Sequence, residues 1–181
     1  MTFHILTGAP GAGKTVLLRG LELAGFGVVE EAATDVIEWR QANGCMEPWK
    51  DPDLVDAILD LQIRRQTAGA SPGSAVFLDR SPVCTLALSR FLGLSPTKRL
   101  IQETAPDRLR AVYRPEVFFV LGLGFITPTP ARRISLEEAG RFEALHRQTY
   151  ESLGFVLVDI SAAPAADRVA QVLGGLSTTP R

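Results

Sequence analysis

The chain of 181 residues is 46% hydrophobic and 22% charged, which is typical of one globular domain and excludes an intrinsically disordered chain. Its formal net charge of -1 argues against a protein that coats nucleic acid or an anionic membrane, so we expect no specific nucleic-acid binding. The sequence enters its first predicted strand at once and has no uncharged apolar run of about 20 residues, so we expect a cytoplasmic protein without a signal peptide or membrane span.

The first predicted elements are a strand over residues 3–7, a glycine-rich turn and a helix that ends near Gly25. The turn reads Gly8-Ala9-Pro10-Gly11-Ala12-Gly13-Lys14-Thr15 and fits the P-loop (Walker A) pattern G-x-x-x-x-G-K-[ST] at every position. In this pattern the glycines let backbone N–H groups turn inward around phosphate oxygens, and the positive end of the following helix adds to the attraction. We therefore predict that this turn and Val16 bind a nucleoside triphosphate, with Lys14 on the β- and γ-phosphates and the Thr15 hydroxyl group on Mg²⁺.

Beyond this helix, strand patterns alternate with helical patterns to the end of the chain. Strands are predicted over residues 28–31, 75–79, 116–121 and 155–159. Helices are predicted over residues 32–42 and 53–67, from Pro82 through Phe91, in short segments around Pro96 and Pro106, from a Ser135–Glu138 capping box through Leu153, and over residues 167–173. We predict a single domain over residues 1–181 with a three-layer α/β/α P-loop NTPase fold, a five-stranded, mainly parallel sheet and a frayed tail over residues 174–181.

Acidic residues follow two of the predicted strands, at the sheet edge where ligands bind in this class of fold. Asp79 ends the third strand, where a carboxylate can hold Mg²⁺ through water or orient a hydroxyl group; its alternative role is an N-cap for the helix that begins near Pro82. Glu30 and Glu31 end the second strand, and one of them is a candidate acceptor for the proton of an attacking hydroxyl group. The alternative is that both glutamates are solvated surface acids.

Arginine residues are the candidates for holding a transferred phosphoryl group, because planar guanidinium groups form paired hydrogen bonds with phosphate oxygens. They are Arg80, and Arg132 and Arg133, which follow a glycine- and proline-rich segment. Residues 122–133 are therefore predicted to form a lid that excludes water when it closes. The alternative for Arg132 and Arg133 is simple solvation at the start of a helix, where the helix dipole makes positive charge unfavourable.

Together these motifs resemble the AAA_28 family of small P-loop ATPase- and kinase-like proteins, which is similar to the ribosylnicotinamide kinase domain and more distantly to nucleoside kinases. The motifs are the stretch from Thr7 to Thr15, Val28-Val29-Glu30-Glu31-Ala32-Ala33, Phe77-Leu78-Asp79-Arg80-Ser81-Pro82 and Ala131-Arg132-Arg133-Ile134. The resemblance implies that Glu31 is favoured over Glu30, that Asp79 and Arg80 act around the acceptor hydroxyl group and phosphates, and that Arg132 and Arg133 are lid arginines. One departure is Thr34, which stands where an arginine often follows the two alanines and weakens the expectation of a phosphate contact there.

The leading hypothesis is a Mg²⁺-dependent, kinase-like enzyme with ATP on the P-loop and a small-molecule acceptor under the lid. Its catalytic set is Lys14, Glu31, Asp79, Arg80, Arg132 and Arg133; Glu31 or Asp79 is the base, and Thr15 and Asp79 hold the metal. The alternatives are an ATP- or GTP-hydrolysing switch that acts through a protein partner, and a phosphohydrolase. Because no base-reading motif such as Asn-Lys-x-Asp is present, ATP and GTP both remain candidates, and the sequence is compatible with a monomer or an oligomer.

Trp49, in a proline-flanked loop, is a candidate for lining the acceptor pocket, although core packing is the commoner role of such residues.

Overall fold

The computed structural model describes residues 3–69, 75–123 and 134–177 of the chain. Its strands form one parallel sheet in the order β2-β3-β1-β4-β5. They are β1 (Phe3–Gly8), β2 (Gly27–Val29), β3 (Val76–Asp79), β4 (Tyr113–Val120) and β5 (Val156–Ile160). All carboxyl ends therefore meet at one edge of the sheet, which is where open α/β folds bind their ligands. Of the predicted lid, residues 124–133 lie outside the described residues, and so do Arg132 and Arg133.

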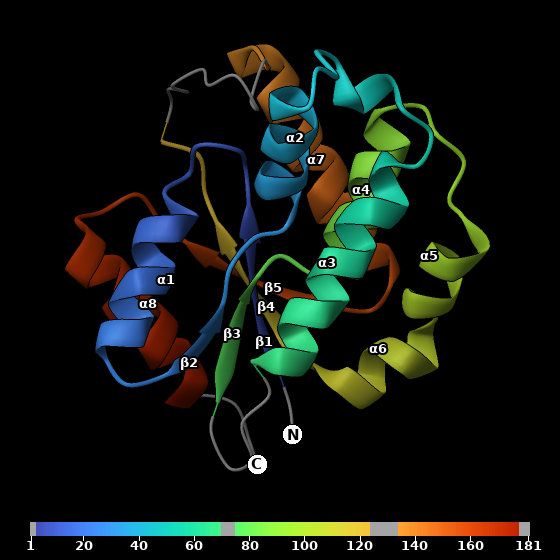
Figure 1. Cartoon of the computed structure of the whole chain (residues 1–181). Coiled ribbons are helices and arrows are strands. Elements are labelled where there is room, and N and C mark those ends of the chain that lie inside the picture. The colour runs from blue at the N-terminus through green and yellow to red at the C-terminus, as the bar shows by residue number, and fades with distance from the viewer. Residues whose placement is uncertain (1–2, 70–74, 124–133, 178–181) are drawn as a thin grey trace.

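Helices cover both faces of the sheet, so the domain has the three layers that the sequence predicts (Figure 1). One face carries α1 (Lys14–Leu23) and α8 (Ala165–Ser177), and the other carries α3 (Leu54–Ala68), α4 (Pro82–Phe91) and α7 (Leu136–Ser152). The remaining helices are α2 (Ala33–Ala42), η1 (Pro48–Lys50), α5 (Lys98–Glu103) and α6 (Pro106–Val112). Within the described ranges, none of the helices has the length and hydrophobicity that spanning a bilayer requires.

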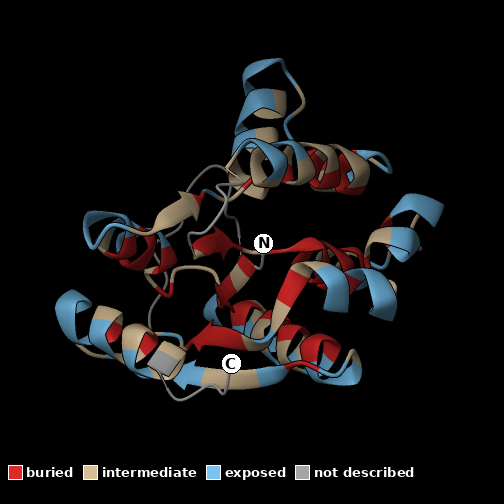
Figure 2. Ribbon diagram, turned by 90° about the horizontal axis from the view of Figure 1, so that it is seen from below, coloured by how far each residue is buried: buried red, intermediate tan, exposed pale blue. Residues whose placement is uncertain are grey.

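The central strands are buried on both faces (Figure 2). Successive side chains of a strand point to opposite faces, so Ile5 and Leu78 pack in the core on the α4 and α7 side, whereas Leu6 and Phe77 pack in the core under α1 and α8. None of these four side chains is more than 2% exposed. This explains the continuous apolar run of β3, and it means that the polar residues at the strand ends stand on a rigid base.

Strand β2 is shorter than predicted and ends at Val29 instead of residue 31. Its last partner is Leu78, and Glu30 and Glu31 lie in the connection to α2. The pairing with β3 stops there, whereas β3 continues beside β1: the N–H group of Arg80 donates a hydrogen bond of 2.9 Å to the carbonyl oxygen of Leu6. The glutamates are therefore loop residues, and strand alternation does not decide which of them faces the site.

The prediction of a frayed tail from residue 174 is wrong for its first part, because α8 continues to Ser177. Gly174 and Gly175 are weak helix formers, which is why the sequence favours an earlier end. Packing decides otherwise: a Cβ atom on Gly175 would lie 2.7 Å from the ring of Phe118 in β4, so the glycine brings this end of the helix close to the sheet. Residues 178–181 lie outside the described residues.

Candidate functional site

The glycine-rich turn joins β1 to α1 and leaves the first backbone N–H groups of α1 without a side-chain cap. Gly8 has a φ of 133°, and a Cβ atom there would lie 2.1 Å from the carbonyl oxygen of Val120 in β4. Gly13, the N-cap residue of α1, is in the left-handed region with a φ of 80°. Uncapped amides at a helix N-terminus next to a turn of this shape suit an anionic ligand such as phosphate.

Lys14 is folded back onto this turn. Its side chain is buried, and Nζ donates hydrogen bonds to the carbonyl oxygens of Gly8 at 3.2 Å and Ala9 at 2.8 Å. Burial and the positive charge of Arg80 lower the pKa of Lys14 to about 8, and the carboxylate of Asp79 acts in the opposite direction. A lysine of this kind gains charge stabilisation when phosphate oxygens replace its carbonyl partners.

Asp79 is buried at the end of β3, opposite Leu6 of β1. Within the described part of the chain, its Oδ1 atom has no hydrogen-bond partner, and burial raises the pKa of the carboxyl group to about 6. The alternative role as an N-cap is wrong, because the cap of α4 is Ser81, whose Oγ atom accepts a hydrogen bond of 3.2 Å from the N–H group of Val83. An orphaned buried carboxylate oxygen is costly unless a ligand satisfies it.

The oxygen chemistry of this corner fits Mg²⁺. Thr15 follows Lys14 at the start of α1 and is exposed, and Asp79 supplies the unpartnered carboxylate oxygen. Hydroxyl and carboxylate oxygens are the hard ligands that Mg²⁺ prefers, usually together with water and phosphate. A divalent cation would also remove the electrostatic cost of ionising Asp79.

Arg80 and Glu31 form an ion pair next to this corner. Arg80 Nε donates a hydrogen bond of 2.6 Å to Glu31 Oε1, and the hydroxyl group of Thr34 donates one of 3.2 Å to Oε2. Burial alone would raise the pKa of Glu31, but the charges of Arg80 and Lys14 outweigh it and lower the pKa. Burial alone would lower the pKa of the Arg80 guanidinium group, but the negative charge of Glu31 outweighs burial and raises this pKa. Glu31 is therefore ionised at neutral pH. Glu31 is half-buried in this contact, whereas its neighbour Glu30 is exposed.

His146 of α7 completes the surroundings of Arg80. Its Nε2 atom lies 3.3 Å from Arg80 Nη1, and its Nδ1 atom lies 3.0 Å from the carbonyl oxygen of Phe142. Burial and then the charge of Arg80 lower the pKa of His146 to about 3, so the ring is neutral. Since a carbonyl oxygen only accepts, Nδ1 carries the proton and Nε2 accepts from the guanidinium group. No local sequence signal identifies this residue, because its contact with Arg80 spans 66 residues.

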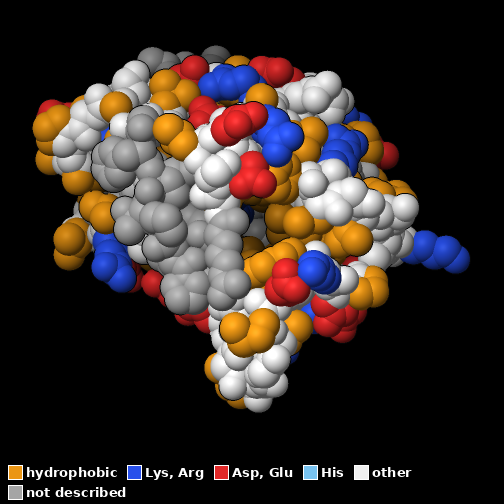
Figure 3. All heavy atoms as spheres, turned by 90° about the horizontal axis from the view of Figure 1, so that it is seen from above, with side chains coloured by type: hydrophobic (Ala, Val, Ile, Leu, Met, Phe, Trp, Pro, Cys, Tyr) orange, Lys and Arg blue, Asp and Glu red, His pale blue; other side chains and the backbone are white. Residues whose placement is uncertain are grey.

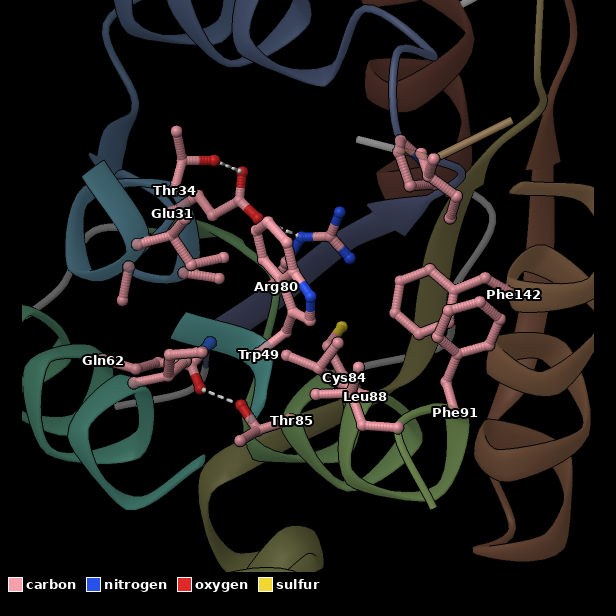
Figure 4. A pocket seen from close by; sticks show the side chains of 17 residues that line it. Glu31, Thr34, Trp49, Gln62, Arg80, Cys84, Thr85, Leu88, Phe91 and Phe142 are labelled. Atoms are coloured by element: carbon pink, nitrogen blue, oxygen red, sulfur yellow. Dashed lines mark hydrogen bonds and ion pairs between the residues drawn. The ribbon is translucent and has the colours of Figure 1, made fainter. Parts of the chain in front are cut away.

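A cavity of about 170 Å³ adjoins the phosphate turn at Pro10. Figure 3 shows a hollow bordered by hydrophobic side chains at this edge of the molecule, with acidic and basic side chains beside it. Its walls are mostly apolar and aromatic, and its polar residues are Glu31, Thr34, Arg80, Gln62 and Thr85. The aromatic residues are Trp49, Phe91 and Phe142 (Figure 4). The cavity can therefore take a small molecule with a flat apolar part.

Gln62 and Thr85 add a polar contact to the apolar wall of the cavity (Figure 4). Both side chains are buried, and the hydroxyl group of Thr85 donates a hydrogen bond of 3.2 Å to Gln62 Oε1. The amide group of Gln62 keeps two N–H donors beyond this contact. Sequence reasoning missed both residues, because neither belongs to a spaced motif that would set it apart from the other polar residues of its helix.

The structure brings four of the predicted catalytic residues together. Glu31, Asp79 and Arg80 all lie close enough to Lys14 to act electrostatically on its amino group. Trp49 lines the cavity and also packs against the core at Leu54 and Ile58, so both roles considered for it apply, whereas Trp39 is 72% exposed. The positions of Arg132 and Arg133 relative to this site stay a prediction.

A Walker A sequence in the turn between the first strand and the first helix of a five-stranded parallel sheet is the arrangement that defines the P-loop NTPase fold. More narrowly, the chain belongs to the AAA_28 family, described as an AAA domain, whose model matches residues 3–168. A search of curated proteins finds no match.

Solved structures with this fold include two kinds of nucleotide-binding protein. Deoxyadenosine kinase from M. mycoides, with its products dCMP and a flexible dCDP bound, has a TM-score of 0.59 and 14% identity, and the match covers 99% of this chain and 100% of that chain. NadR protein in complex with NAD and AMP-PNP has a TM-score of 0.67 and 17% identity, and the match covers 98% of this chain and 51% of that chain. At identities this low, the similarity shows that this chain shares the fold of these proteins and nothing more.

Proposed function

We propose that the chain is a Mg²⁺-dependent phosphotransferase that moves the γ-phosphoryl group of ATP to a hydroxyl group of a small molecule. The observation that carries this proposal is that Pro10 of the glycine-rich turn and the ion pair of Glu31 and Arg80 line the same cavity. A nucleotide switch needs the phosphate turn but no acceptor cavity beside it, so the cavity favours the kinase.

Glu31 is the proposed general base. It is ionised at neutral pH and lines the cavity, whereas Asp79 has a raised pKa and is not among the residues that line it. The acceptor oxygen attacks the γ-phosphorus, its proton passes to Glu31, and the bond to the β–γ bridging oxygen breaks to release ADP. This proposal gives the role of base to Glu31 and leaves Asp79 to the metal, whereas the sequence allows either carboxylate to be the base.

Positive charge stabilises the phosphoryl group during its transfer. Lys14 exchanges its carbonyl partners for phosphate oxygens, and Arg80 faces the group from the cavity side. Arg132 and Arg133 join them in this proposal when the lid closes. Bound Mg²⁺ would neutralise phosphate charge, and Thr15 and Asp79 are the residues that would hold it.

The lining of the cavity supports an acceptor of the nucleoside or ribosylnicotinamide class. Aromatic side chains suit a flat heterocycle, and the amide group of Gln62 suits a ring that carries its own carbonyl or amide group. The ribose of such an acceptor would supply the hydroxyl group near Glu31. ATP is the proposed donor, and GTP is the competing donor in the test.

The test is a screen for phosphorylated products. The protein is incubated with Mg²⁺ and ATP or GTP against nucleosides, ribosylnicotinamide and sugars, and products are detected by mass spectrometry. Glu31→Gln should lower the rate of transfer by about 10²- to 10⁴-fold while ATP affinity changes little, because the proton acceptor is lost and the ion pair with Arg80 becomes a neutral hydrogen bond. Glu30→Gln is the matched control: Glu30 is the exposed neighbour of Glu31, and its replacement should leave the rate unchanged.

Two results would contradict the proposal. One is the absence of any phosphorylated acceptor in the screen together with ATP hydrolysis that Glu31→Gln does not affect. The other is equal loss of transfer in Glu30→Gln and Glu31→Gln, which would show that the ion pair with Arg80 has no special role.

A further inference from the structure

Arg80 adopts a backbone conformation that a residue with a side chain rarely takes. Its φ is 77°, and it is the one non-glycine residue with positive φ in the described part of the chain. Such a conformation is about 1–3 kcal/mol less favourable and persists only where several contacts fix it together. The backbone contact is the hydrogen bond from Arg80 N–H to Leu6, and the side-chain contacts are those with Glu31 and His146.

Helix α7 holds the turn that contains Arg80 at two points. His146 contacts Arg80, and Tyr150 lies one helical turn further along. The hydroxyl group of Tyr150 is 2.6 Å from Ser81 Oγ and 3.0 Å from Cys84 Sγ. Because residues four positions apart share one face of a helix, α7 presents both side chains to the turn between β3 and α4.

The contact with His146 requires a neutral imidazole ring. The charged groups that act on the ring are Arg80, Lys14 and Glu31, and His146 itself is completely buried. A second proton on the ring would point a cation at Arg80, which can only donate hydrogen bonds. The hydrogen bond from Nδ1 to the carbonyl oxygen of Phe142 instead keeps the Nε2 lone pair directed at the guanidinium group.

We infer that His146 is a positioning residue for Arg80. Glu31 fixes Nε and His146 fixes Nη1, so the plane of the guanidinium group is set from two sides, and Nη2, which bonds to neither of them, can face a phosphoryl oxygen. The role in transfer rests on the proposed function, whereas the contact itself does not. His146 acts through Arg80 and has no place of its own among the residues that line the cavity.

The activity test compares three variants. His146→Leu removes the lone pair and should lower the rate of transfer by about 10- to 100-fold with ATP affinity within about threefold, because a misplaced guanidinium group affects the transition state more than the ground state. His146→Gln places an acceptor oxygen near the Nε2 position and should restore most of the rate. Thr149→Val is the control, since Thr149 is buried on the same helix and bonds to Arg90 and Leu145.

An NMR measurement tests the contact without an acceptor. The chain has only two histidines, so ¹⁵N spectra of the imidazole rings are readily assigned with a His4 variant. Between pH 5 and 8, His146 should keep a protonated Nδ1 and an unprotonated Nε2. The Arg80 Nη1–H signal, whose proton faces His146, should be protected from exchange in the wild type and exposed in His146→Leu.

The outcomes separate the two proposals. Protection of Arg80 that depends on His146, without any phosphorylated acceptor, would support the contact and count against the kinase. A His146 ring that titrates near its ordinary pKa of about 6.5, or an Arg80 signal unchanged in His146→Leu, would overturn the inference whatever the activity. Equal loss of rate in Thr149→Val and His146→Leu would also overturn it, because the effect would then be general to α7.

Discussion

At the scale of single residues, the site depends on Asp79, a buried carboxyl group near Lys14 whose Oδ1 atom has no hydrogen-bond partner among the described residues. Most protein carboxylates have a lowered pKa and stabilise the fold as the pH rises. Asp79 is the opposite case, because burial raises its pKa to about 6. The fold therefore holds the proton of Asp79 more tightly than the unfolded chain does, and ionisation of this group costs stability until a cation compensates it.

This sign gives a prediction for the ligand-free protein. The free energy of unfolding of the wild type should fall relative to that of Asp79→Asn as the pH rises from about 4 to about 6, by at most about 3 kcal/mol. Urea unfolding at a series of pH values measures the difference. Parallel pH profiles for the two proteins would show that Asp79 does not titrate in this range.

Among the described glycines, Gly8 leaves the least room for a side chain. Its φ is 133°, and a Cβ atom would collide with the carbonyl oxygen of Val120. We expect Gly8→Ala to cost more than about 3 kcal/mol, whereas Gly44→Ala, at a φ of 91° with open space around it, should cost about 1–2 kcal/mol. Thermal unfolding of both variants compares them. Similar midpoints would contradict the close approach of β1 and β4.

At the scale of elements, two helices near the site begin with serine caps in different surroundings. Ser81 is buried and bonds to both Val83 and Tyr150, whereas Ser135 forms an exposed capping box with Glu138. Ser81→Ala should cost about 2–3 kcal/mol, because the cap is lost and the Tyr150 hydroxyl group loses a partner. Ser135→Ala should cost about 1 kcal/mol. Equilibrium unfolding in urea gives both values, and equal costs would argue against the Tyr150 contact.

Most elements could be predicted from local patterns, and the differences have local causes. The apolar run of β3 and the Ser135–Glu138 capping box identify their elements directly. The end of β2 depends on where its pairing with β3 stops, and the end of α8 depends on the contact of Gly175 with Phe118. Such ends are set by packing between segments that are far apart in the sequence, which a local pattern does not contain.

At the scale of the whole molecule, the contrast between local patterns and contacts across the chain also explains which residues of the site can be predicted from the sequence. Lys14 and Asp79 carry a local signal, because one lies in a spaced motif and the other ends an apolar strand. His146 and Gln62 lack one, because each is a single polar residue whose role comes from partners on other elements. The parallel sheet places Lys14 and Asp79 at one edge, and the helices α7 and α3 bring His146 and Gln62 to the residues gathered there.

The central claim is that a triphosphate on residues 8–15 presents its γ-phosphoryl group to the cavity beside Glu31. A crystal structure with Mg²⁺ and AMP-PNP tests it most directly. We predict that Lys14 Nζ leaves the carbonyl oxygens of Gly8 and Ala9 for the γ-phosphate, and that Arg80 faces the same group from the cavity. A triphosphate bound elsewhere, or a γ-phosphate directed away from the cavity with Lys14 still on its carbonyl partners, would contradict the claim.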